Sequence, residues 1–211
     1  MEQKELVRQE LGRWLKHLFY VYGAGLALGL LSLVPVLEGI CAVGSYVVTL
    51  LVVLVLFRLG KSEAGYRRGA VFTALAFALQ LVNYAFSLMM LGQVAFTPEL
   101  AVQLGLVSGA MAAGSTVLSF IGLYHVYSTH GALVPELAGK WHSLFRWTLF
   151  AGVGAAVLTA VSAALTQTWL AAATTLVYGL ASFAFEILRL VLLRKTQYML
   201  SGTSRNSPFA I

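Results

Sequence analysis

The chain has 211 residues, of which 59% are hydrophobic and 10% are charged, and its mean hydropathy is +0.84. Soluble domains carry about 25% charged residues, so this composition excludes an ordinary water-soluble domain and is typical of a chain dissolved in lipid. The formal charge of +6 does not indicate a nucleic-acid-binding protein, because the basic residues lie between long apolar runs and form no patch with interleaved aromatic side chains.

The N-terminal segment, residues 1–17, is predicted to be an amphipathic helix. Apolar side chains recur in it at helical spacing, and charged side chains lie between them. Such a helix either lies on the inner leaflet or extends the first membrane span into the cytoplasm. We do not read the segment as a cleaved leader, because the apolar run that follows it is long and lacks a clean small-residue cleavage site.

Six stretches downstream are apolar for the roughly 20 residues that a membrane-spanning helix requires. The predicted spans are 18–36, 39–57, 69–91, 100–124, 144–165 and 170–193. The first two follow each other so closely that Pro35 and Gly39 must reverse the chain between them. The fold class is therefore all-α, a polytopic membrane bundle of six transmembrane helices in three hairpins, followed by a short tail at 196–211.

Two Pro-Glu pairs mark helix starts. In the first, Pro98 and Glu99 follow Thr97, which is a favourable N-cap before proline at the first helical position. The second, Pro135 and Glu136, predicts a short cytoplasmic helix that leads into the fifth span, with a kink near Ser143.

The basic residues predict the orientation of the chain. All 14 lie before the first span, between spans 2 and 3, between spans 4 and 5, or near the end of span 6. The other three connections carry none. Because lysine and arginine favour the cytoplasmic side, we expect both termini in the cytoplasm and a multi-pass protein of the plasma membrane, in a bacterium the cytoplasmic membrane.

Three spans carry polar stripes that are predicted to face the interior of the bundle. At about 100° per residue, Gln80, Asn83 and Tyr84 share one arc of the third span. Tyr178, Ser182, Glu186 and Arg189 share one side of the sixth, and the fifth has a stripe of small and hydroxyl side chains. We expect either a polar path between helices 3, 5 and 6 or hydrogen bonds across a packed bundle. Small-residue ladders at Gly25/Gly29 and Gly105/Gly109 would allow close helix approach.

Glu186 is the sharpest candidate, because a charge inside a membrane span is costly. It is either a carboxylate that couples transport to a proton or cation, or one half of a structural ion pair with Arg189 at i,i+3. Replacing it with glutamine should abolish activity in the first case and leave it intact in the second.

No catalytic motif, cofactor motif or metal motif is found. The chain lacks aspartate and any HExxH or GxSxG pattern, its single Cys41 cannot form an intrachain disulfide, and the four histidines show no i,i+4 ligand pair. We therefore expect no catalytic, cofactor or metal site.

The size, the six crossings and the Gly/Ala-rich helices are similar to the substrate-binding membrane components of energy-coupling-factor vitamin transporters. The resemblance is one of architecture, and the short outer loops depart from it where a lid over the vitamin would be expected. Three functions are predicted in order of preference. The first is a small transporter or channel-like subunit for a small solute or ion, acting as a homo-oligomer or with a partner membrane subunit. The second is a non-catalytic scaffold or accessory subunit, and the third is a membrane-embedded enzyme.

Overall fold

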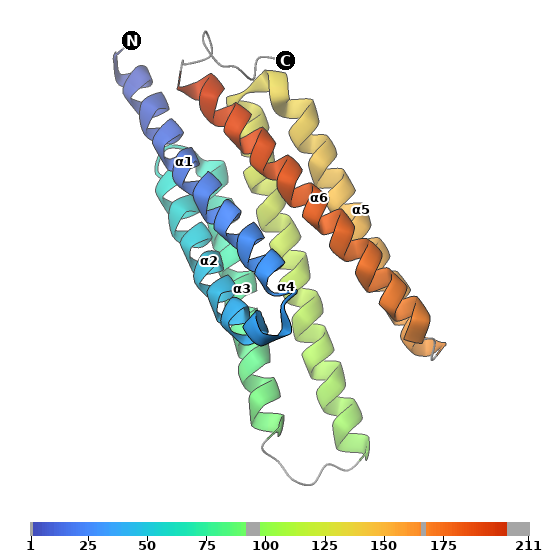
Figure 1. The fold of residues 1–211 in the computed structure, drawn as a ribbon. Helices are drawn as coiled ribbons and strands as arrows, with labels where there is room; N and C mark the ends of the chain where they lie inside the picture. The colour runs from blue at the N-terminus through green and yellow to red at the C-terminus, as the bar shows by residue number, and fades with distance from the viewer. Residues whose placement is uncertain (1, 92–97, 166–167, 202–211) are drawn as a thin grey trace.

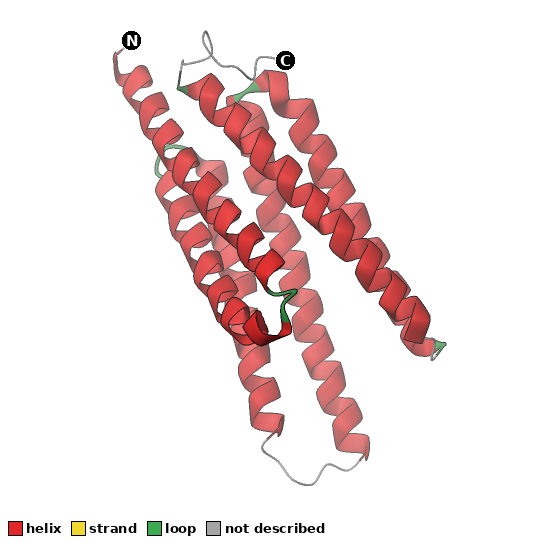
Figure 2. Ribbon diagram, in the orientation of Figure 1, coloured by secondary structure: helices red, strands yellow, loops and turns green. Residues whose placement is uncertain are grey.

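The computed structural model describes residues 2–91, 98–165 and 168–201, and this part of the chain consists of long helices joined by short turns (Figures 1 and 2). The elements are α1 (Glu2–Leu31), the 3₁₀ turn η1 (Pro35–Leu37), α2 (Glu38–Leu59), α3 (Ala64–Leu91), α4 (Pro98–Leu133), α5 (Pro135–Ala164) and α6 (Thr168–Leu200). Each of the six α-helices contains a stretch long and apolar enough to cross a membrane. The predicted all-helical class is therefore confirmed, as is the prediction of six helices long and apolar enough to span a membrane.

The two ends of the bundle differ in what they carry (Figure 1). One end, which we call the basic end, holds the start of α1, the turn at residues 60–63, the α4–α5 junction at Val134 and the end of α6. The other end holds η1, the end of α3 and the starts of α4 and α6. We call it the neutral end because its described residues include no lysine or arginine, although Glu38 and Glu99 lie there. The sequence predicts that the basic end faces the cytoplasm.

The helices are longer than the apolar stretches that predicted them. The first two predicted elements form one continuous helix, α1, so residues 2–17 continue the first predicted span instead of forming a separate element. That helix ends at Leu31, before Pro35, and not at residue 36. Its Leu11 and Leu15 are buried in the protein, which explains why the amphipathic pattern extends so far toward the N-terminus.

Helices α4, α5 and α6 also extend beyond their predicted spans at the basic end. Helix α4 continues to Leu133 instead of ending at 124, and α5 begins at Pro135, so the predicted short helix and the fifth span form one element. Helix α6 extends to Leu200, while residues 202–211 of the predicted tail lie outside the described residues. A hydropathy window measures only the lipid-soluble part of a helix, whereas the backbone stays helical until proline or another breaker stops it.

The neighbours of each helix determine which faces meet. Helix α3 packs against α2 and α4, and α6 packs against α5 and α1. Of the three helices predicted to line one polar path, α5 and α6 pack together, and α3 packs on the other side of the bundle. Helical periodicity assigns polar residues to a face, but it does not identify the helix that the face meets.

Helices α3 and α4 approach each other closely at a pair of glycines. A Cβ atom added at Gly69 would lie 2.6 Å from Val126 Cγ2, and one added at Gly122 would lie 2.8 Å from Thr73 Oγ1 and 3.2 Å from the Gly69 carbonyl oxygen. The missing side chains let the two backbones meet directly.

The predicted ladders act in this way at one position out of four. A Cβ atom at Gly25 would lie 3.2 Å from Val48 Cγ1 of α2, whereas one at Gly29, Gly105 or Gly109 would meet no atom within 4 Å. Close approach at a glycine therefore depends on the residue that faces it on the neighbouring helix, which spacing in one helix does not reveal.

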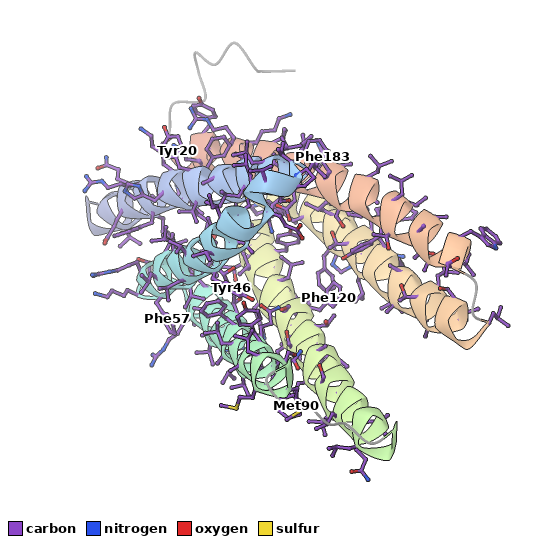
Figure 3. The ribbon with its side chains drawn as sticks, turned by 60° about the horizontal axis from the view of Figure 1, so that its bottom comes forward. Tyr20, Tyr46, Phe57, Met90, Phe120 and Phe183 are labelled. Atoms are coloured by element: carbon purple, nitrogen blue, oxygen red, sulfur yellow. The ribbon has the colours of Figure 1, made fainter. Side chains whose placement is uncertain are left out.

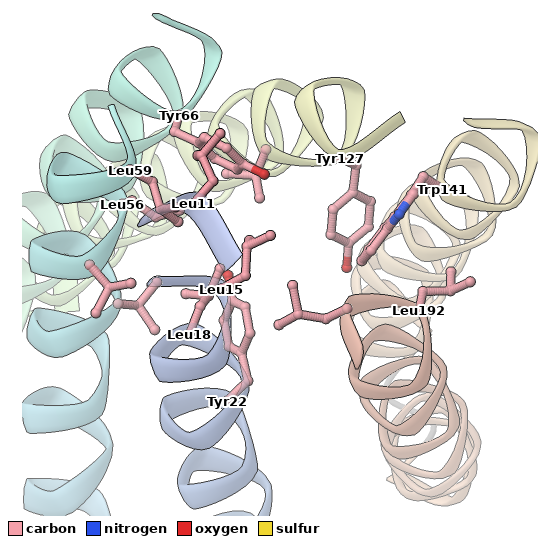
Figure 4. Close-up of a cluster of buried hydrophobic side chains, with 14 of the residues drawn as sticks. Leu11, Leu15, Leu18, Tyr22, Leu56, Leu59, Tyr66, Tyr127, Trp141 and Leu192 are labelled. Atoms are coloured by element: carbon pink, nitrogen blue, oxygen red, sulfur yellow. The ribbon is translucent and has the colours of Figure 1, made fainter. Parts of the chain in front are cut away.

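Most of the buried apolar side chains gather at the basic end (Figure 4). Figure 4 shows leucines of α1 and α2 on one side of this core and Tyr127 and Trp141 on the other. Because lipid is about as apolar as leucine, this packing stabilises the fold through van der Waals contact and hydrogen bonds more than through transfer from water. The core fixes the helices at one end and leaves them free to diverge at the other.

Candidate functional site

A cavity of about 1080 Å³ lies between α1, α2, α4 and α6, with Thr73 contributed by α3. It extends from Tyr22, Glu186 and Arg189 toward Leu33 at the neutral end. Its wall is mostly apolar and carries seven hydroxyl side chains, which belong to Tyr22, Ser45, Thr49, Thr73, Ser119, Thr175 and Ser182. This volume is slightly above the usual range for small-molecule sites, about 300–1,000 Å³.

The shape of the bundle produces this cavity. Figure 3 shows the α5–α6 pair diverging from α3 and α4 toward the neutral end, with Phe120 directed into the intervening space. The Phe120 ring lies against α5, because a Cβ atom at Gly152 would be 2.6 Å from its Cζ atom. Phe120 thus separates α5 from the cavity, and no described residue of α5 lines it.

An ion pair forms the base of the cavity. Arg189 Nη2 donates to Glu186 Oε2, as the i,i+3 spacing predicts. The guanidinium also lies over the ring of Tyr22 on α1, with Cζ 3.7 Å from the ring centroid, a cation–π contact that joins α6 to α1. Glu186 is 36% exposed and Arg189 is 15% exposed, so the carboxylate is the more accessible of the two charges.

Arg189 is held on its other side by the packed core. Its guanidinium interacts with the hydroxyl of Tyr127 on α4. Its Nε atom is buried and has no hydrogen-bond partner within the described part of the chain. Arginine has five N–H donors in a planar fork, so this residue retains donor capacity beyond Glu186 and Tyr127.

A network of buried aromatic and polar groups closes the basic end behind Arg189. Tyr127 lies 4.9 Å from Trp141 between ring centroids, and Trp141 stacks on His130 at 4.5 Å. The Tyr66 hydroxyl shares a hydrogen bond of 2.7 Å with His130 Nδ1, and Trp141 Nε1 donates to Thr196 Oγ1 at 3.1 Å. These five side chains come from α3, α4, α5 and α6, so the network connects four helices at the basic end.

Of the seven candidate residues, the structure brings three together at this site. Ser182, Glu186 and Arg189 line the cavity. Tyr178 lies on the same helix but is exposed and does not line it.

The three candidates on α3 lie elsewhere. Gln80 is exposed, and Asn83 Oδ1 accepts a hydrogen bond from Ser108 Oγ of α4 at 2.8 Å. The exposed Tyr84 lies 6.1 Å from the ring of Tyr46 on α2. The Asn83 contact matches the alternative interpretation of the polar stripes, in which they hydrogen-bond between packed helices.

Sequence reasoning missed two groups of residues. Tyr22 at the base of the cavity continues the stripe of Leu11, Leu15 and Leu18 on α1, and this spacing could have marked it as inward-facing. The Tyr66–His130–Trp141 network carried no such signal, because its members lie far apart in the sequence and histidine near a membrane boundary is ordinary.

Chemically, the arrangement can bind a ligand that has both polar and apolar parts. The base of the cavity provides one carboxylate, one guanidinium and the phenol of Tyr22, with hydroxyl groups along the wall. Together these can orient a polar group while the apolar wall holds the rest of a ligand.

Comparison with known proteins adds no family to this description. No protein-family model, curated protein or solved structure matches the chain at a significant level. The conclusions about function therefore rest on the residues and the geometry described above.

Proposed function

We propose that the chain is a small integral membrane transporter or channel-like subunit, and that its ligand site is the cavity between α1, α2, α4 and α6. The observation that carries the proposal is an ion pair, Glu186–Arg189, at the base of a large cavity. A structural pair would be expected to lie between packed helices, because burial of charge beside empty space is costly without a bound partner or water.

The shape of the bundle supports the same proposal. The basic end is closed by the buried core, and the opposite ends of the helices diverge (Figure 3). A site that is closed at one end and open at the other is the arrangement required of one state of an alternating-access cycle. In this proposal the closed end faces the cytoplasm of a bacterial cell, and the subunit acts with further copies of itself or with a partner.

The proposal can be tested by cysteine labelling in membranes. Cys41 is buried and is the single cysteine, so a Cys41→Ala background leaves no competing thiol. In that background Ser182→Cys places a thiol on the cavity wall, and Val177→Cys places one on the outer surface of the same helix.

We expect a charged methanethiosulfonate reagent to modify position 182 and not position 177, because lipid excludes a charged reagent from the outer surface. Equal inertness of the two positions would contradict a hydrated ligand site. A thiol introduced at Lys61 tests the orientation separately, since it should react from the cytoplasmic side alone.

A second candidate function is a non-catalytic accessory subunit, and one observation favours it. Leu176, Val177 and Leu180 of α6 are about two-thirds exposed where α6 leaves the rest of the bundle. In this candidate a helix of a partner subunit fills the wedge beside them. Labelling of position 182 in the gently extracted protein, before and after dissociation of the complex, distinguishes the two functions, because a partner that fills the wedge should protect that position until the complex is dissociated. Native mass spectrometry of the same sample identifies the partner.

A further inference from the structure

The charges that line the cavity sum to zero. Glu186 and Arg189 are the charged members of its described lining, one acidic and one basic. A ligand with a net charge would leave one charge uncompensated among apolar side chains, which is costly in a medium of low polarity. A ligand with one positive and one negative group leaves the net charge of the cavity at zero, because each group can pair with one member of the ion pair.

Neither member of the pair is saturated. In the described part of the chain Glu186 is bound through one carboxylate oxygen, and the Nε atom of Arg189 is buried without a partner. The more exposed carboxylate can accept hydrogen bonds from an ammonium group. The planar guanidinium can donate in parallel to a phosphate or carboxylate.

The cavity has an apolar rim on the side of α1 and α6. Leu30 of α1 and Leu176 and Leu180 of α6 line this rim and are 47–66% exposed, and all three lie within stretches suited to the membrane interior. This side therefore faces hydrocarbon, whereas the lining residue Leu33 lies at the neutral end, where the proposed function places the opening to water. A molecule that enters past the three leucines of the rim comes from the bilayer.

We propose that the ligand is a zwitterionic amphiphile, with an ammonium group bound by Glu186, a phosphate bound by Arg189, and an alkyl chain that follows the apolar wall to the rim. This inference rests on the proposed function and names its substrate class. The volume of about 1080 Å³ accommodates a headgroup together with a chain, and is larger than a compact ion or solute requires.

Three amphiphiles with the same dodecyl chain and different headgroups show how the charge of the headgroup affects binding. They are dodecylphosphoethanolamine (zwitterionic), dodecyl phosphate (anionic) and dodecylammonium (cationic), and both ammonium groups carry N–H donors. Binding of each to the full-length protein in neutral maltoside micelles is measured by native mass spectrometry over a concentration series. We expect the zwitterion to bind about tenfold more tightly than either charged amphiphile.

Variants of the pair should change the preference in opposite directions. Arg189→Gln should shift it toward the cation, and Glu186→Gln toward the anion, each by about tenfold relative to the wild-type protein. The control is Arg194→Gln, which removes a charge from the same helix outside the cavity and should leave the preference unchanged.

The wild-type series decides the question even if a variant does not fold. Equal binding of the three amphiphiles, or tightest binding of a singly charged one, overturns the ligand class but leaves the proposed function standing if position 182 is reactive. Absence of binding together with an unreactive position 182 overturns the proposed function itself.

Discussion

The two ends of this bundle differ both in the residues they carry and in how tightly their helices pack. At the basic end, Trp141, Tyr66 and His130 are almost fully buried and hold four helices together through stacking and hydrogen bonds. Toward the neutral end, α5 and α6 leave the other helices, and leucines and valines remain exposed to the surroundings.

The difference shows how a short membrane chain can be tightly packed at one end and open at the other. Lipid solvates apolar side chains as well as a protein core does, so an apolar wall facing a wedge carries little penalty. The helices are held together mainly by polar and aromatic side chains that stack on or hydrogen-bond to one another at the basic end. The part of the molecule with the cavity can therefore stay open because the basic end holds the helices.

The largest effect is expected from the centre of the basic end. Trp141→Ala removes the ring that stacks on His130 and donates to Thr196, and leaves a void among buried side chains. We expect a loss of about 3–5 kcal/mol in the free energy of unfolding, measured by steric trapping or by the thermal midpoint in one detergent.

The matched control for this change is Trp147→Ala on the same helix. Trp147 is 62% exposed, so its replacement should change stability by about 0.5 kcal/mol or less. Similar losses for the two tryptophans would contradict the view that the basic end holds the fold together.

More of the fold than of the site could be predicted from the sequence. Helix existence follows from apolar length, because no other structure satisfies the backbone of a 20-residue apolar stretch in lipid. The extensions of α4 to Leu133 and α6 to Leu200 were missed because they are helical without being uniformly apolar. The pairing of Glu186 with Arg189 could be predicted because it is local to one helix.

The rest of the site depends on which helices meet. Asn83 and Gln80 were grouped with Glu186 because each lies on a polar face, yet Asn83 bonds to Ser108 of α4. Tyr22 meets Arg189 across the α1–α6 contact, which joins the first and last helices of the chain. A single sequence contains no measure of such long-range pairing, so these members of the site required coordinates.

A second prediction concerns the contact between α3 and α4. Gly122→Ala places a methyl group 2.8 Å from Thr73 Oγ1 and 3.2 Å from backbone atoms of α3, which cannot move aside like the tip of a flexible side chain. We expect a loss of about 2–3 kcal/mol in the free energy of unfolding.

Gly109→Ala is the control on the same helix toward the neutral end. No atom lies within 4 Å of its added methyl group, and alanine is the better helix former, so stability should be unchanged or rise by up to about 1 kcal/mol. An equal loss at both glycines would show that helix α4 is tightly packed along its whole length and would weaken the comparison between the two ends.

A smaller effect is expected from the hydrogen bond between Tyr66 and His130. Tyr66→Phe keeps the ring but leaves the Nδ1 atom of a buried histidine without its partner. We expect a loss of about 1–2 kcal/mol in thermal or trapping measurements. Tyr124→Phe removes a hydroxyl from an exposed ring and should have little effect; a loss as large as that at Tyr66 would mean that burial of the hydroxyl is not what matters.

The smallest effect should come from the hydrogen bond that joins α3 and α4 on the neutral side. Ser108→Ala removes the donor to Asn83 Oδ1, and interhelical bonds of this kind contribute about 0.6 kcal/mol on average in membrane proteins. Ser87→Ala is the control, because its hydroxyl donates to the Asn83 carbonyl oxygen within its own helix. A double-mutant cycle between Ser108→Ala and Asn83→Ala isolates the pair. A coupling energy as large as the loss at Tyr66 would mean that both ends of the bundle are held by polar contacts, and that the wedge stays open for a reason other than weak cohesion between helices.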